Sequence, residues 1–172
     1  MLYMGKNNKK QLNPGQVIIP VNHPNPPEPH EVDVAFILAR HYRCTVSFLM
    51  PIDDYKRKTA DIVMFGVEWE IKSPTGNSKY TIQEQFRRAS KQAKNIIIDT
   101  RRTKLRYELI ERSVFTELSK RPHIKKLILI DKSEKAVEIL KSLYYNVTCR
   151  KTGQSWLGSQ RSILRWKNTS DG

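Results

Sequence analysis

Two short runs of aliphatic residues constrain the fold of this chain most strongly. NIIID (Asn95 to Asp99) and KKLILID (Lys125 to Asp131) are largely apolar and are bounded by polar residues. Runs of this length and composition are typical of buried strands. Amphipathic or basic segments with the character of helices occupy about 81–94 and 104–120, before and between the two runs. We therefore expect a sheet that is flanked by helices.

The region before Asn95 adds one helix and three strands. Side chains of one helical face recur from Glu31 to about Arg43. Three short runs with strand character follow, at 44–50, 61–65 and 67–72. The last two are separated only by Gly66, whose freedom at positive φ suits a tight hairpin. The predicted order α-β-β-β-α-β-α-β is that of an α/β protein with a mixed central sheet flanked by helices, and 132–145 would add a helix or a last strand.

Length and composition predict one principal domain. The chain has 172 residues, of which 38% are hydrophobic, enough for one core. Six prolines between positions 14 and 29 predict an extended arm over 1–29, followed by the domain over 30–150 and a polar tail over 151–172. The sequence has no apolar run near the roughly 18 residues of a membrane span, and no secretory signal. These features predict a soluble, cytoplasmic protein.

The charge distribution points to nucleic acid as the partner. The formal net charge is +14, which attracts polyanions. Residues 79–126 contain 14 Lys or Arg and five acids, whereas 28–70 contain eight acids and five bases. An acidic cluster beside a basic flank is what a nuclease needs, because carboxylates hold a cation and basic side chains hold phosphates. The alternative interpretation is a pair of ordinary solvated helix surfaces.

One group of side chains carries the candidate chemistry. Strand alternation over 67–72 places Glu68, Glu70 and Lys72 on one face. A hairpin at Gly66 would bring Asp61 close to Glu70. Two carboxylates beside an amine suit Mg²⁺, which binds through one or two carboxylates and substrate phosphate, and Lys72 would orient the attacking water or stabilise the developing charge.

Three further residues are candidates for the same site. Glu31 occupies the first turn of the first helix on its otherwise apolar face, so it would point inward as a third metal or water ligand, or else be an ordinary helix acid in solvent. Gln85 and Gln92 share a stripe beside the apolar face of the second helix. They would position water or substrate, or simply flank that face.

Several basic side chains are predicted to bind phosphate, because a guanidinium fork matches phosphate oxygens and sets position more than chemistry. These nucleic-acid-binding candidates are Arg87, Arg88, Lys91, Arg101 and Arg102.

These residues resemble a known pattern, that of the PD-(D/E)XK nuclease superfamily with its αβββαβ core. Asp61 matches the first acid, Glu70-Ile71-Lys72 matches the E-x-K motif, and Glu31 matches the acid of the first helix. Ala60 stands where the family usually has proline. The run TADIVMFGVEWEIKSPTGNSKYTIQEQFRRASKQAKNIIID, with His30-Glu31 before it and Arg101-Arg102 after it, is similar to the C-terminal tRNA nuclease domain of contact-dependent growth inhibition (CdiA) toxins.

The resemblance implies a metal-dependent endonuclease that cleaves RNA of the tRNA type and has a cognate immunity protein. The expected catalytic residues are Glu31, Asp61, Glu70, Lys72, Gln85 and Gln92. The expected ligands of Mg²⁺, or of Mn²⁺ in its place, are Asp61, Glu70, Ile71 and Glu31.

Other hypotheses stay open. The same fold also serves DNA endonucleases, and charge does not separate RNA from DNA. A non-catalytic nucleic-acid-binding module is the main rival, and a protein-interaction module that meets an acidic inhibitor or regulator is a third. The sequence likewise leaves open whether the chain forms a homo-oligomer.

Overall fold

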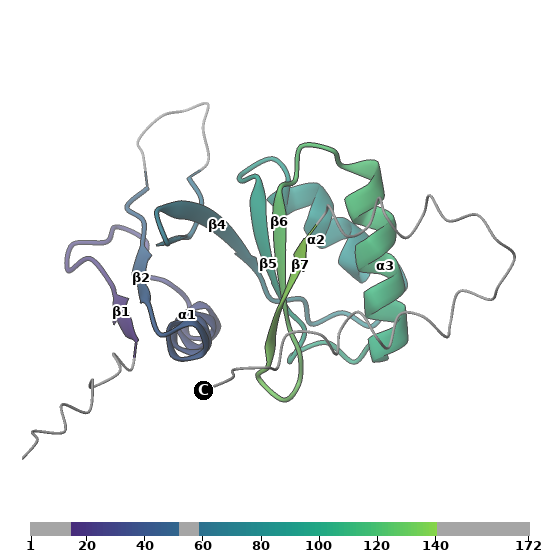
Figure 1. The fold of residues 1–172 in the computed structure, drawn as a ribbon, viewed down its shortest axis with the longest axis horizontal. Helices are drawn as coiled ribbons and strands as arrows, with labels where there is room; N and C mark the ends of the chain where they lie inside the picture. The colour runs from purple at the N-terminus through teal and green to yellow at the C-terminus, as the bar shows by residue number, and fades with distance from the viewer. Residues whose placement is uncertain (1–14, 52–58, 141–172) are drawn as a thin grey trace, which may run out of the picture.

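The fold is mixed α/β in a computed structural model, which describes residues 15–51 and 59–140 (Figure 1). In chain order the elements are β1 (Gln16–Ile18), α1 (Pro29–Tyr42), β2 (Thr45–Phe48), β3 (Ile62–Met64), β4 (Val67–Lys72), α2 (Thr81–Ala89), β5 (Asn95–Asp99), α3 (Tyr107–Lys120), β6 (Lys126–Ile130) and β7 (Ala136–Leu140). No helix in these ranges is long and apolar enough to cross a membrane.

The seven strands form one mixed sheet in which spatial order follows chain order from β1 to β7. Strand β3 is antiparallel to its neighbours β2 and β4, and β4, β5 and β6 are parallel to one another. At the two edges, β1 pairs parallel with β2 and β7 pairs antiparallel with β6. The carboxyl ends of β4, β5 and β6 therefore lie along one end of the sheet, called here its carboxyl edge, as distinct from the two edge strands. Lys72, Asp99 and Ile130 mark that edge.

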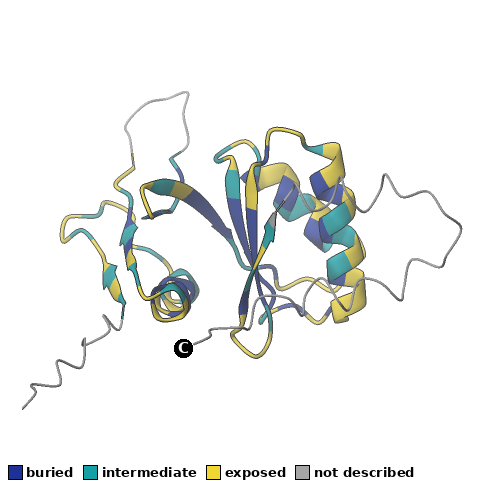
Figure 2. Ribbon diagram, in the orientation of Figure 1, coloured by how far each residue is buried: buried dark blue, intermediate teal, exposed yellow. Residues whose placement is uncertain are grey.

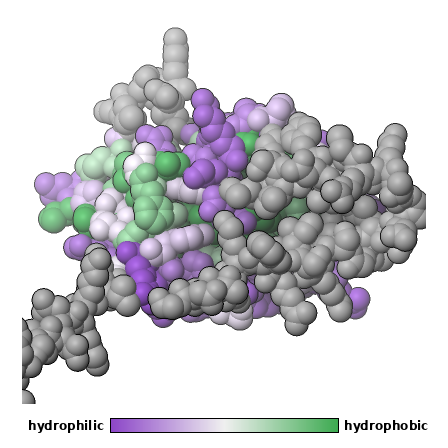
Figure 3. Space-filling view, viewed as in Figure 1, coloured by the Kyte–Doolittle hydropathy of each residue, from purple (hydrophilic) through white to green (hydrophobic). Residues whose placement is uncertain are grey.

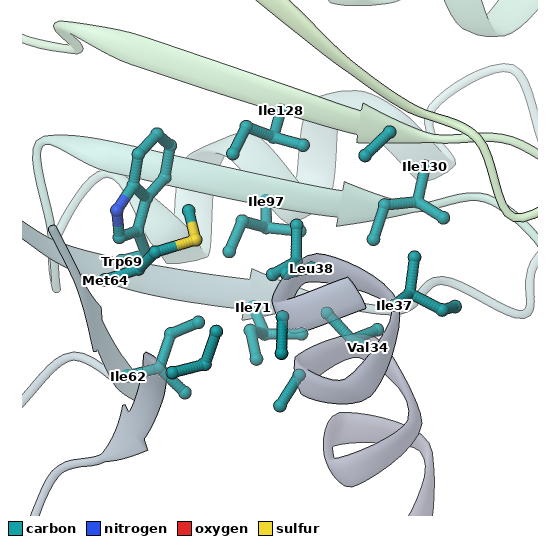
Figure 4. Packing of buried hydrophobic residues seen from close by; sticks show 14 of the residues in the cluster. Val34, Ile37, Leu38, Ile62, Met64, Trp69, Ile71, Ile97, Ile128 and Ile130 are labelled. Atoms are coloured by element: carbon teal, nitrogen blue, oxygen red, sulfur yellow. The ribbon is translucent and has the colours of Figure 1, made fainter. Parts of the chain in front are cut away.

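Helices cover both faces of the sheet, which confirms the predicted α/β architecture. Helix α1 packs on one face against alternate side chains such as Ile71, Ile97 and Ile128 (Figure 4). Helices α2 and α3 pack on the other face against Ile96 and Ile98, among others. The buried layers lie between helices and strands, and exposed residues cover the outer sides of the helices (Figure 2). The aliphatic runs that predicted buried strands thus fill two cores, one from each parity of residue.

The hairpin at Gly66 forms as the sequence predicts. Phe65 and Gly66 both have positive φ, 54° and 69°, and they form the two-residue connection between β3 and β4. Two central residues with φ above zero are characteristic of a type I′ turn, whose twist matches that of the strands. The hairpin sets the register that places Ile62 opposite Trp69.

Helix boundaries differ from the sequence prediction at two places. The helix expected over 81–94 ends at Ala89, and the bonds from Lys91 N–H to Arg88 O and from Gln92 N–H to Ala89 O are i→i−3 contacts. The chain turns there to enter β5 at Asn95, whose side-chain amide donates to Glu68 O at 3.0 Å. This tertiary contact overrides the apolar period that continues to Ala93.

The helix expected over 104–120 begins at Tyr107. The residues before it stay outside the helix, because Thr103 and Leu105 are buried there and bonded through Thr103 Oγ1, which accepts from Leu105 N–H and donates to Gly76 O. The segment after Lys132 contains a strand, β7, and not a helix. Its continuation to 145 and the predicted tail over 151–172 lie outside the described residues.

Part of the predicted arm belongs to the sheet. Gln16–Ile18 form edge strand β1, parallel to β2. Apolar residues with at least 40% exposure gather around this strand and the loops near it, namely Ile18, Ile19, Val21 and Met50. A hydrophobic area shows on this side of the molecule in the space-filling view (Figure 3). The proline-rich segment after β1 then leads directly into α1 at Pro29.

Candidate active site

The β3–β4 hairpin brings Asp61 and Glu70 together. Asp61 immediately precedes β3, and its backbone N–H donates to Trp69 O at 3.1 Å. Its carboxylate oxygen Oδ2 accepts the Ile71 N–H at 2.6 Å. Glu70 lies between Trp69 and Ile71 in β4 and is fully buried. Two carboxyl groups from opposite strands of one hairpin thus share a small volume at the sheet edge.

Burial raises the pKa of both acids. For Glu70 the pKa is raised to about 7, first by burial and then by the charge of Asp61. Burial also raises the pKa of Asp61, which the Ile71 N–H and Lys72 partly oppose and the charge of Glu31 reinforces. The site therefore holds two carboxyl groups whose charged forms are disfavoured in the absence of a compensating cation.

Lys72 compensates only part of this charge. Its ammonium forms an ion pair with Glu70 Oε1. The second oxygen, Glu70 Oε2, is buried and has no hydrogen-bond partner in the part of the chain that the structure describes. An unsatisfied buried oxygen of this kind is costly, so it calls for a ligand that donates or carries positive charge.

A pocket of about 510 Å³ opens beside Asp61. Its lining comes from the segment before α1, the first turn of α1, the ends of β2 and β3, and the turn after α2. Glu31, Asp61 and Gln92 all line it, so three of the sequence candidates from distant segments meet here. Glu70 lies outside the pocket lining, and Gln85, half-buried on α2, is also absent from it.

Glu31 is engaged at the start of α1. Its Oε2 accepts the Glu28 backbone N–H at 3.0 Å and completes a capping box. Its charge nevertheless raises the pKa of both Asp61 and Glu70. Glu31 therefore lies near Asp61 and Glu70, but its carboxylate is bonded to the backbone at the start of α1.

The structure separates the predicted phosphate-binding residues into two groups. Arg87 and Arg88 form ion pairs with Glu84 on the outer face of α2. Arg101 donates from Nε to Oδ1 of the fully buried Asp99 at 2.9 Å and from Nη2 to its Oδ2 at 3.0 Å. Lys91 and Arg102 are exposed and have no carboxylate partner among the described residues. Arg101 thus supports a buried acid, which sequence spacing alone does not reveal.

Sequence reasoning missed one residue of the pocket, His23. Its Nε2 lies 2.9 Å from Leu49 O, so that nitrogen carries the proton, and its Nδ1 is buried without a hydrogen-bond partner in the described part of the chain. It comes from the proline-rich segment, where a single histidine carries no periodic signal. The position of His23 in the pocket wall follows only from the packing of that segment against β2.

The donor set suits a hard divalent cation. Within 15–51 and 59–140 no group of three or more His, Cys, Asp and Glu side chains is placed to enclose a metal. Mg²⁺ needs no such cage, because it keeps several waters and is bound through one or two carboxylates and substrate phosphate. Asp61 and the unpartnered oxygen of Glu70 fit that requirement. Ile71 has its side chain in the core, so only its backbone carbonyl would add an oxygen.

Residues 58–136 match the contact-dependent growth inhibition CdiA C-terminal domain family. This CdiA-like segment runs from before Asp61 to the first residue of β7, so it contains Asp61, Glu70 and Lys72, whereas Glu31 and His23 precede it. Among solved structures, a CdiA-CT/CdiI toxin and immunity complex from Burkholderia pseudomallei is similar, with 17% sequence identity, a TM-score of 0.49, and coverage of 73% of this chain and 99% of that chain. Comparison with curated proteins gave no match.

Proposed function

We propose that this protein is a metal-dependent endonuclease of the CdiA C-terminal type that hydrolyses phosphodiester bonds in RNA, with tRNA as the favoured substrate. The observation that carries the proposal is the pairing of half-buried Asp61 with fully buried Glu70 beside Lys72, in which one Glu70 oxygen lacks a partner among the described residues. The match of residues 58–136 to the CdiA family supports the toxin class. The preference for RNA rests on the motif resemblance, because the net charge of +14 suits RNA and DNA equally.

Each residue has a role that its position supports. Asp61 and Glu70, with the Ile71 carbonyl, would hold Mg²⁺ or Mn²⁺, with Glu31 as a further acid nearby. Such a cation supplies positive charge to the scissile phosphate and lowers the pKa of a bound water. Lys72 holds its ammonium against Glu70 and would stabilise the negative charge that develops on the phosphate. Gln92, in the pocket wall, would orient water or substrate.

The decisive experiment is a cleavage assay with purified protein. Substrates are tRNA, single-stranded DNA and duplex DNA, each with Mg²⁺, with Mn²⁺ and with EDTA. Lys72→Ala is compared with Lys125→Ala, which removes the same charge from an exposed position at the opposite edge of the sheet. We expect metal-dependent cutting of tRNA that Lys72→Ala abolishes and Lys125→Ala retains.

Either of two results would overturn the proposal. Cutting that persists in EDTA and in Lys72→Ala would exclude this site as the catalyst. Salt-sensitive binding without cutting of any substrate would identify a non-catalytic nucleic-acid-binding module.

An acidic inhibitor protein is a second proposed partner, of the immunity type. The excess of basic side chains on the surface offers it the same electrostatic attraction as nucleic acid. A matched test is inhibition of tRNA cleavage by the candidate protein at physiological salt, with an unrelated acidic protein of equal charge as control.

A further inference from the structure

The segment between β5 and α3 presents basic side chains in a regular way. Thr103 and Leu105 are buried, whereas Arg102, Lys104 and Arg106 are exposed. The alternation of burial exposes three cationic side chains to solvent along a short stretch without regular secondary structure. Thr103 anchors the stretch, because its hydroxyl donates to Gly76 O at 2.6 Å. The cations are therefore mounted on a backbone that is fixed to the loop after β4.

Two of these cations line a second cavity, of about 410 Å³. Lys104 and Arg106 meet Lys132 around it, at the carboxyl ends of β5 and β6 and the first turn of α3. Its lining also contains the buried aliphatic side chains Leu105 and Ile110, with Tyr107 beside them. The volume lies within the range of small-ligand pockets. The cations suit the phosphate of a nucleotide, and the aliphatic and aromatic side chains suit its base.

These cations are not used inside the protein. Among the described residues, no carboxylate lies within ion-pair distance of Lys104, Arg106 or Lys132, in contrast to Arg87, Arg88 and Arg101. The acid in the lining, Asp131, accepts the backbone N–H groups of Ser133 and Lys135 and the hydroxyl of Ser133. Helix α3 begins there without a side-chain cap, so its first amides add positive potential.

We propose that this cavity binds one nucleotide of the nucleic-acid substrate, away from the bond that is cut. Its phosphate contacts Lys104, Arg106 and Lys132, and its base packs against Tyr107 and Leu105. The inference rests on the proposed nuclease function and adds a substrate-binding site to it. Lys104, Arg106 and Lys132 do not belong to the set of residues that the sequence predicted to bind phosphate.

The cavity is within reach of the catalytic pair along one substrate strand. Lys72 ends β4, and the cavity lies at the carboxyl ends of β5 and β6, up to two strands further along the same edge. Two inter-strand spacings amount to about 10 Å. A helical nucleic-acid strand advances about 3.4 Å per nucleotide, so the two sites are separated by roughly three nucleotides. Glu70 and Lys72 share a sheet face with Ile96 and Ile98, the face that α3 also covers.

Binding of tRNA tests the proposal without any need for cleavage. Titrations use the Glu70→Gln protein and add Lys104→Ala together with Lys132→Ala. We expect the Kd to rise about tenfold or more, and the slope of log K against log salt to fall by about 1.4 to 1.8, as two lost phosphate contacts require. Lys94→Ala together with Lys125→Ala in the same background is the charge-matched control, because both side chains are exposed. The double substitution to arginine should restore tight binding.

A mononucleotide locates the site directly. We expect adenosine monophosphate to shift the backbone amide resonances of Tyr107, Glu108 and Ser133 in a nuclear magnetic resonance titration. Inorganic phosphate, the second probe, should shift them less, because it lacks a base to pack against Tyr107. Equal shifts from both probes would overturn the base contact and leave a phosphate site only.

The outcomes separate this proposal from the proposed function. Unchanged affinity and salt slope in the Lys104/Lys132 variant, with the fold intact by circular dichroism, would overturn the nucleotide site while leaving cleavage at Asp61 and Glu70 unaffected. Loss of binding in that variant, alongside cleavage that ignores Lys72→Ala, would support the nucleotide site and overturn the catalytic assignment.

Discussion

Asp61 and Glu70 face each other across the β3–β4 hairpin so closely that the charge of Asp61 adds to burial in raising the pKa of Glu70. Burial likewise raises the pKa of Asp61, and the adjacent Glu70 carboxyl partly lowers it. Two carboxylates this close, one fully buried and one half-buried, need a shared proton or a cation. The chain keeps an arrangement that is unfavourable in the absence of a ligand, which is typical of a binding or catalytic site.

Glu70→Gln should stabilise the metal-free protein while abolishing cleavage. A glutamine retains an acceptor for Lys72, places an amide donor toward Asp61 and removes a buried charge. We expect the free energy of unfolding at pH 8 to rise by about 1–2 kcal/mol, which corresponds to a rise in Tm of about 2–8 °C for a chain of this size. Thermal unfolding in EDTA is the measurement. A lower Tm than that of the unsubstituted protein would contradict the cost assigned to the buried carboxylate.

Divalent metal should stabilise the unsubstituted protein through the same pair. At ten times its Kd, a ligand that binds only the folded state adds about 1.4 kcal/mol. We therefore expect Mg²⁺ to raise the Tm by a few degrees, EDTA to reverse the rise, and Asp61→Asn to abolish it. An equal Mg²⁺ effect in Asp61→Asn would place the metal elsewhere.

Arg101→Ala should destabilise the fold far more than the neighbouring Arg102→Ala. Asp99 is fully buried, and Arg101 contacts both of its oxygens. Breaking a buried pair by removing one partner costs about 3–5 kcal/mol, because the remaining charge stays desolvated. Arg102 is exposed, so its truncation should cost less than about 0.5 kcal/mol. Urea unfolding of the two variants measures the difference, and equal costs would contradict a structural role for Arg101.

Gly66→Ala should loosen the hairpin that aligns the catalytic pair. Gly66 has φ 69°, and a Cβ built there meets no atom within 4 Å, so the cost is one of backbone conformation alone. An alanine in the left-handed region costs about 1–2 kcal/mol, whereas Gly66→Asn should cost less because asparagine tolerates that region. Stability curves of both variants check the order, and a larger loss in Gly66→Asn would contradict it.

Much of the fold follows from local patterns in the sequence. The strands at Val67–Lys72 and Asn95–Asp99 lie where composition and alternation predict them. Alternation also places Glu70 and Lys72 on the face opposite Trp69 and Ile71. These features can be deduced because a strand has a period of two, and burial of one set of side chains determines the direction of the other.

Other features depend on contacts between segments that are distant in the chain. Helix α2 ends at Ala89 because Asn95 bonds to β4, and β1 joins the sheet only by pairing with β2. His23 reaches the pocket wall through the same docking of the N-terminal segment.

The catalytic candidates Asp61, Glu70 and Lys72 were determined by the sequence itself, through strand parity and a turn at Gly66. Tertiary structure alone decided that Arg101 serves the buried Asp99, and that Lys104, Arg106 and Lys132 gather around a cavity without a carboxylate partner in the described part of the chain. The physical reason is that periodicity fixes which way a side chain points, whereas its partner is chosen by whatever the completed fold brings within reach.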